Sequence, residues 1–111
     1  MSRLIATLLT FILASSAHAK PAYPVLFQGE SCLFGFCYDV DVTVEEDGAC
    51  VVDYPDYSVD CTWQYSRGSL QGEVVTADGD VWTGERISFS CFDGETDVGG
   101  LTGSMWVCAV L

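Results

Sequence analysis

Polar and apolar side chains alternate along most of the chain after residue 35. From Phe36 to Val44, apolar residues occupy every second position, with polar residues between them. The same period recurs over residues 59–65 and 87–91, and no segment beyond residue 20 has the 3.6-residue period of a helix. A period of two is typical of strands with one buried face. The pattern predicts an all-β domain, a small antiparallel sandwich or barrel of about six to eight short strands.

Turn residues separate these alternating runs. Phe34-Gly35, Pro55-Asp56 and Gly99-Gly100 each stand at the centre of a possible two-residue turn. In such a hairpin, residues equidistant from the turn centre face each other. The dipeptide Asp78-Gly79, which tolerates the positive φ of a type I′ turn, predicts a further hairpin that joins residues 74–77 to 80–83.

The cysteines are even in number and predict three structural disulfides that stabilise the domain. The chain contains no C-x-x-C pair, so neither a zinc site nor a redox motif is expected. Six cysteines allow 15 pairings, and spacing alone does not choose among them. The three two-residue turns favour one pattern, in which neighbouring cysteines pair across each turn; other pairings stay open. The pairs are Cys32–Cys37, Cys50–Cys61 and Cys91–Cys108.

The first residues predict export. A basic start is followed by an apolar stretch from Leu4 to Ala14 and by the small residues Ala17 and Ala19 around His18. This pattern predicts a signal peptide over residues 1–19, because the stretch is too short to span a bilayer. We expect a secreted or periplasmic protein with no membrane segment after cleavage. Residues 20–30 predict a proline-containing lead-in with one short edge strand at most, and residues 31–111 a single disulfide-bonded β domain.

Charge excludes several classes of function. All sixteen acidic residues but only three of the four basic ones lie beyond residue 19, so cleavage leaves a net charge of −13 and removes the one histidine. The chain therefore has too few basic residues for a face that binds nucleic acid. Without a histidine, it is also not expected to use histidine-based catalysis. Serines have no histidine to activate them. We expect no cofactor and a function other than catalysis.

Five residues are the candidate contacts for a partner. Asp39, Asp41 and Glu45 share one side of a predicted strand, and Tyr54 and Tyr57 flank a turn. The acidic side either keeps the protein soluble or attracts a basic protein or peptide. The sequence thus favours a small acidic exported binding protein, such as an inhibitor of a basic extracellular protein. The alternative is a secreted toxin or host-directed effector, which would act on foreign cells without salt-sensitive binding to a basic protein.

A glycine-flanked acidic segment raises the question of calcium. Asp93, Glu95 and Asp97 alternate within residues 93–100. The calcium-binding loop of the EF-hand requires glycine at its sixth position and glutamate at its twelfth, where Val98 and Ser104 stand. We therefore expect a solvated acidic hairpin tip here, and no metal site.

Overall fold

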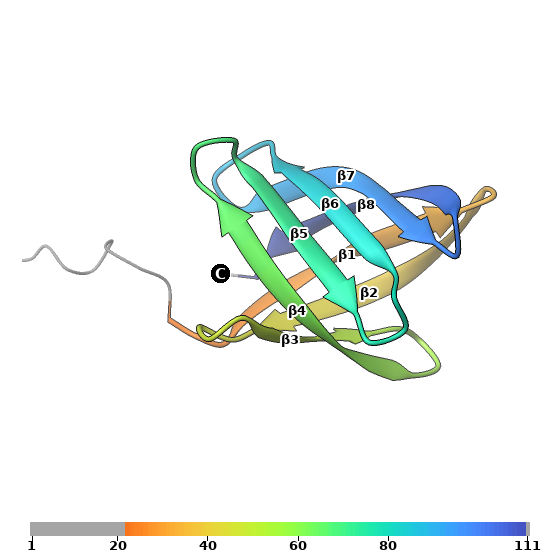
Figure 1. Cartoon of the computed structure of the whole chain (residues 1–111), viewed down its shortest axis with the longest axis horizontal. Coiled ribbons are helices and arrows are strands. Elements are labelled where there is room, and N and C mark those ends of the chain that lie inside the picture. The colour runs from red at the N-terminus through yellow and green to blue at the C-terminus, as the bar shows by residue number, and fades with distance from the viewer. Residues whose placement is uncertain (1–21, 111) are drawn as a thin grey trace, which may run out of the picture.

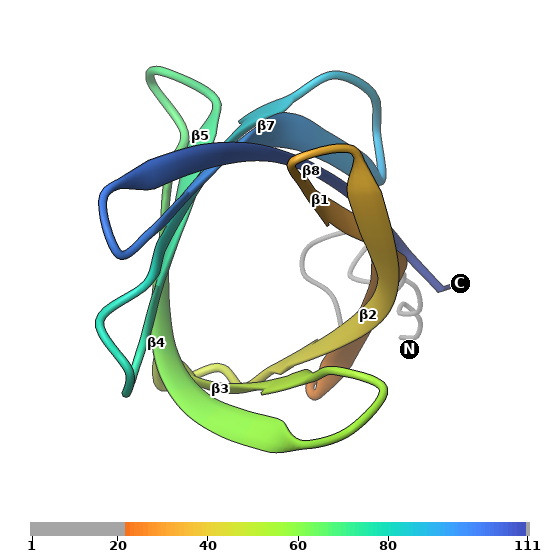
Figure 2. The same cartoon turned by 90° about the vertical axis from the view of Figure 1, so that its right-hand side faces the viewer.

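Eight antiparallel strands close into a barrel (Figure 1). Each strand pairs with its neighbours in sequence, and the last strand pairs with the first, which closes the ring seen end-on in Figure 2. The computed structural model describes residues 22–110, and the predicted signal peptide lies outside them. The strands are β1 (Val25–Leu33), β2 (Phe36–Val44), β3 (Ala49–Asp53), β4 (Ser58–Ser66), β5 (Gln71–Thr76), β6 (Val81–Arg86), β7 (Cys91–Val98) and β8 (Leu101–Ala109).

The all-β prediction is confirmed, and of its two architectures the structure has the barrel. The closing pair, β1 with β8, joins segments about eighty residues apart, from Phe27 opposite Ala109 to Cys32 opposite Ser104. Residues 22–110 contain no helix long and apolar enough to cross a membrane.

Three hairpin registers and all three disulfides match the prediction. The turns at Phe34-Gly35, Pro55-Asp56 and Gly99-Gly100 each set two cysteines directly opposite each other. Both residues of the first turn have positive φ, 55° at Phe34 and 82° at Gly35, as a type I′ turn requires. The bonds join Cys32 to Cys37, Cys50 to Cys61 and Cys91 to Cys108, and no cysteine of the described chain is free.

The hairpin between β5 and β6 differs from the prediction by one residue. Thr76, rather than Ala77, pairs with Asp80, so the loop has three residues and ends at Gly79 with φ of 91°. A three-residue loop with glycine in the left-handed region is the next most common hairpin connection. The shifted register sets Trp82 opposite Val74, which keeps both side chains on the inner face.

The predicted lead-in is a full strand over much of its length. β1 begins at Val25, directly after Pro24, and is paired on both sides, with β2 and with β8. The expected short edge strand is therefore an interior strand of the barrel. Proline interrupts a strand only where its missing N–H is needed, and Pro24 precedes the first paired residue.

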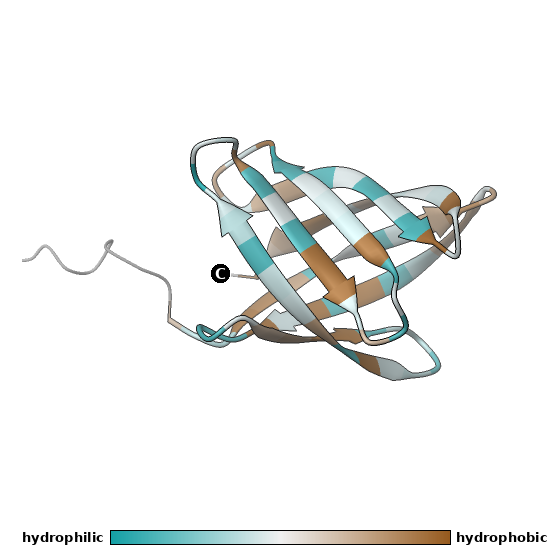
Figure 3. Ribbon diagram, in the orientation of Figure 1, coloured by the Kyte–Doolittle hydropathy of each residue, from teal (hydrophilic) through white to brown (hydrophobic). Residues whose placement is uncertain are grey.

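Alternating side chains of the strands fill the barrel. The strand alternation is visible as apolar and polar bands along the ribbon (Figure 3). Val40, Val52 and Trp82 are fully buried, and the Cys50–Cys61 disulfide is buried with them, whereas the other two disulfides face outward. The complete apolar core is Val40, Val42, Val44, Cys50, Val52, Val59, Cys61, Trp82, Met105 and Val107.

Glycines allow neighbouring strands to approach closely inside the barrel. A Cβ atom at Gly29 would lie 1.9 Å from the Trp106 carbonyl oxygen, and one at Gly94 would lie 1.9 Å from the Thr83 carbonyl oxygen. Such distances exclude any side chain at these two positions. The close approach at each position suits a barrel small enough for its own side chains to fill.

Candidate functional site

Four carboxylates gather on the outer face of β1, β2 and β3. Glu30 lies opposite Asp39, and Asp41 lies opposite Asp53. Opposed residues have Cβ atoms about 4.5–5.5 Å apart, so each pair brings two negative charges together. We call these four residues the acidic strip. The alternation correctly placed Asp39 and Asp41 on one side of a strand. It did not predict that Glu30 and Asp53 lie opposite them, because the pattern within one strand does not show which residues of the neighbouring strands pair with it.

Neutral donors contact two members of the acidic strip. The Trp106 indole Nε1 donates to Glu30 Oε1 at 3.3 Å, and the Ser58 hydroxyl donates to Asp53 Oδ1. The arginines of the described chain, Arg67 and Arg86, stand outside β1, β2 and β3. Arg86 lies at the end of β6, where its guanidinium donates to the carbonyl oxygens of the loop that follows. The acidic strip therefore faces solvent without an arginine on its own strands.

Glu45, the third acid of the predicted contact set, lies apart from the acidic strip. It follows β2 directly, four residues beyond Asp41, which corresponds to about 13 Å along an extended chain. Its side chain is exposed, and its carbonyl oxygen accepts a hydrogen bond from Trp63 Nε1 at 2.8 Å. Glu45 thus extends the acidic side toward the turn between β2 and β3.

The segment considered for calcium is a strand for most of its length. Asp93, Glu95 and Asp97 belong to β7, and only Gly99-Gly100 forms the turn. Alternate strand residues project in parallel from one face, about 6.8 Å apart, so their carboxylates do not converge on one point. The expected hairpin tip is in fact an acidic outer face of β7, and Asp93 there lies opposite Glu85 of β6.

The two tyrosines of the predicted contact set stack on each other. The ring centroids of Tyr54 and Tyr57 are 4.9 Å apart, and Tyr54 also contacts the edge of Trp82. Burial, with smaller contributions from Tyr57 and Asp80, raises the pKa of Tyr54 to about 12. The neighbouring Trp82 N–H acts in the opposite direction, although it forms no hydrogen bond. Tyr54 is half-buried and supports Tyr57, which is 54% exposed. Of the pair, Tyr57 is available for contact.

Three aromatic residues of the β1–β2 hairpin are exposed, and the alternation did not predict this. Phe34 is 73%, Phe36 71% and Tyr38 50% exposed, although Phe36 and Tyr38 continue the inward face of Val40. Residues 36–40 extend past the part of β2 that is paired with β3, so β3 does not pack beside Phe36 and Tyr38. The available signal was Phe34 itself, since the first position of a type I′ turn strongly favours Asn, Asp or Gly.

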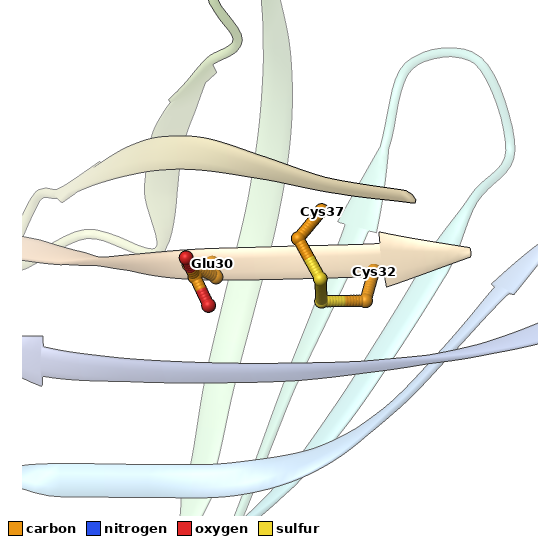
Figure 4. Close-up of side chains that lie close together, drawn as sticks. All are labelled: Glu30, Cys32 and Cys37. Carbon is orange, nitrogen blue, oxygen red and sulfur yellow. A yellow bond between two sulfur atoms is a disulfide. The ribbon is translucent and has the colours of Figure 1, made fainter. Parts of the chain in front are cut away.

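One group of side chains has the composition of a metal site. Glu30, Cys32 and Cys37 place a carboxylate oxygen and two sulfur atoms within 4.8 Å of one another (Figure 4). The two sulfurs form a disulfide, so they offer no thiolate, and the carboxylate accepts the Trp106 N–H. The group is a disulfide with an acidic neighbour.

Shallow surface depressions lie over the outer faces of β4 and β5. One is lined by Thr62, Trp63, Gln64, Glu73 and Val75. Its carboxylate, Glu73, accepts a hydrogen bond from Gln64. A second depression adjoins the first and shares both of these residues. A single, partly buried carboxylate does not provide the pair of acids that glycoside hydrolysis uses.

Comparison with known proteins adds no family to this description. No family model matches the chain, and neither the curated proteins nor the solved structures yield a match.

Proposed function

We propose that this chain is a small acidic exported binding protein that acts without catalysis, and that its partner is a basic protein or peptide. Inhibition of a basic extracellular protein is one function of this kind. Three disulfides within so small a domain are typical of extracellular or periplasmic proteins and support export.

The observation that carries the proposal is the opposition of like charges across neighbouring strands. Glu30 with Asp39 and Asp41 with Asp53 form two such pairs. Like charges directly opposite each other destabilise a sheet, so folding alone gives no reason for them. A cationic partner that lies across β1, β2 and β3 would remove this repulsion on binding. Single exposed pairs contribute only about 0–1 kcal/mol, so the affinity must come from several acids together.

The proposal is tested with a panel of cationic proteins and with polylysine as a generic cation. The association rate of the disulfide-bonded protein is measured as a function of salt. Rates should fall steeply from low to physiological ionic strength, where charges act over about 8 Å. The triple variant Asp39→Asn, Asp41→Asn, Glu45→Gln should associate about tenfold more slowly or worse.

A matched control separates position from net charge. The variant Asp93→Asn, Glu95→Gln, Asp97→Asn removes the same number of charges from the outer face of β7. It should slow association less than the β2 variant does. If the association rates did not depend on salt, or fell equally in both variants, solubility would be the only role left for these acids.

A further inference from the structure

Strand β2 has a free edge at the end where it leaves the β1–β2 turn. β2 pairs with β1 over its whole length, from Phe36 to Val44. Its pairing with β3 covers only Asp41 to Val44, because β3 ends at Asp53. Residues 36–40 therefore have a partner strand on one side alone, and in Figure 1 β2 diverges from β3 toward the β1–β2 turn.

The register shows which backbone groups lie on that edge. Cys32 and Cys37 face each other with Cα atoms 4.0 Å apart, the short spacing of a pair without mutual backbone hydrogen bonds. The alternation of the ladder then directs the N–H and C=O groups of Cys37 and Asp39 away from β1. No backbone hydrogen bond in residues 22–110 outside the strand ladders ends on either residue.

The side chains along this edge are exposed as well. The four residues from Phe36 to Asp39 form an unbroken exposed run at the start of a strand whose remainder is largely buried. Natural edge strands are usually blunted by charges, prolines or bulges. Here Asp39 is charged, but Phe36 and Tyr38 present aromatic surface beside unpaired backbone groups. The Cys32–Cys37 disulfide and the two-residue turn hold the edge extended before any partner arrives.

We propose that the free edge of β2, residues 36–40, takes up an extended segment of the basic partner as an additional strand. This inference rests on the proposed function and assigns its contact geometry. An added strand would pair with the backbone groups of Cys37 and Asp39, the mode in which extended peptides join sheet edges. Its side chains would alternate between the two faces of β2.

Charge determines the chemistry of the added strand. On the outer face it would meet Asp39 and the adjoining Asp41 and Asp53, which favours lysine or arginine at every second position. On the inner face it would meet Phe36 and Tyr38, which favours apolar residues between them. A second copy of this chain is the less suitable occupant, because each copy carries a formal net charge of −12, or −13 after the predicted cleavage.

The test uses synthetic capped peptides of about eight residues, which is within the usual range of strand lengths. The first alternates lysine and valine. The second has the same sequence with every backbone amide N-methylated, so that it keeps its charge but cannot donate a backbone hydrogen bond from either edge. The third replaces lysine by glutamate. Amide hydrogen exchange of the whole disulfide-bonded protein is followed by NMR with each peptide.

We expect the lysine–valine peptide to slow exchange at Cys37 and Asp39 about tenfold or more, while Tyr38, whose N–H already faces β1, changes little. The N-methylated peptide should bind about tenfold more weakly and leave both amides unprotected. Binding of the lysine–valine peptide without this alternating protection would overturn the edge site and leave the proposed function standing. Equal protection by the glutamate peptide would retain edge pairing and overturn the basic partner. The inference would be overturned if no peptide slowed exchange at Cys37 and Asp39. It would also be overturned if these amides became protected without peptide, through self-association at high protein concentration.

Two variants at one residue give an independent readout. Asp39→Asn removes the charge and keeps the N–H, whereas Asp39→Pro also removes the N–H that points to the free edge. The proline deletes no ladder bond to β1, so the fold should persist. Asp39→Asn should weaken the lysine–valine peptide a fewfold and Asp39→Pro about tenfold further. Equal affinities of the two variants would place the peptide elsewhere.

Discussion

Thr96 lies directly opposite Trp82 across β6 and β7, and each of them carries a buried polar atom without a hydrogen-bond partner. The Thr96 hydroxyl and the Trp82 indole N–H both lie inside the barrel, and neither atom is accessible at the protein surface. A buried hydroxyl in this state costs about 1–3 kcal/mol.

Thr96→Val should therefore stabilise the protein by about 1 kcal/mol, since valine keeps the shape and removes the hydroxyl. Thr76 is the matched control: it is equally buried, but its hydroxyl accepts the Asp80 backbone N–H at 3.1 Å. Thr76→Val should cost about 1 kcal/mol. Urea unfolding under non-reducing conditions measures both, and the same sign for the two variants would contradict the assignment.

Gly94→Ala should prevent formation of the barrel. The added methyl group would lie 1.9 Å from the Thr83 carbonyl oxygen, and backbone on a neighbouring strand cannot yield without loss of pairing. We expect a loss above about 3 kcal/mol. Gly72 also faces inward, but there a Cβ would meet the Phe92 ring at 3.4 Å, an ordinary contact. Circular dichroism should show Gly72→Ala folded and Gly94→Ala unfolded; a folded Gly94→Ala variant would refute the close approach.

Asp80→Asn should raise stability at neutral pH and leave it unchanged in acid. Burial, with added repulsion from Asp78 and Asp97, raises the pKa of Asp80 above its usual value. The folded protein thus holds this proton more tightly than the unfolded chain. The resulting stabilisation is complete below the unfolded pKa of about 4 and is lost as pH rises through the folded value. Thermal melts at neutral pH and at about pH 3 test this, with exposed Asp60→Asn as the equal change of charge. A gain that is the same at both pH values would contradict the shift.

Phe34→Asn should stabilise the β1–β2 turn and weaken partner binding, because it removes one of the three exposed aromatic side chains of this hairpin. Phe34 has φ of 55°, a region that costs a bulky residue about 1–2 kcal/mol and asparagine less. Leu70, at φ of 58° in the β4–β5 loop, provides a control away from the hairpin. Both asparagine variants should melt higher, but only Phe34→Asn should lower affinity for the lysine–valine peptide. If Phe34→Asn bound the lysine–valine peptide with unchanged affinity, the Phe34 side chain would not be part of the proposed contact.

Mild reduction of the native protein should open Cys32–Cys37 before Cys50–Cys61. Cys37 is exposed on the outer face, whereas Cys50 is 4% and Cys61 8% exposed within the core. A reductant must reach a sulfur atom to attack it, so the buried bond should react only on unfolding. Alkylation and mass mapping at short times show the order, and early labelling of Cys50 would contradict it.

The hairpins were largely predictable from sequence, whereas the exposed contact surface was not. Turn centres set the register of the strands that they join, so the turns at Pro55-Asp56 and Gly99-Gly100 favoured the pairs Cys50–Cys61 and Cys91–Cys108, which the structure has. The loop before Asp80 escaped this reasoning because a two-residue and a three-residue turn share the same Asp-Gly signal.

The pairing of β1 with β8 joins residues about eighty positions apart, and no local pattern sets such a register. The alternation likewise predicted that Phe36 and Tyr38 face the buried side of the sheet, but both side chains are exposed. Pleating decides which way a side chain points, but the length of the neighbouring strand decides whether anything covers it, and β3 ends too early to do so.

Because each disulfide closes one hairpin, the cysteines pair strictly in the order in which they leave the ribosome or a translocation channel. Each partner follows the previous cysteine by 5, 11 or 17 residues, so a pair can meet while the next one is still enclosed. Oxidation of an emerging chain would therefore give the native set without the reshuffling that interleaved bonds require. Only the docking of β8 against β1, which involves no covalent bond, has to wait for the complete chain.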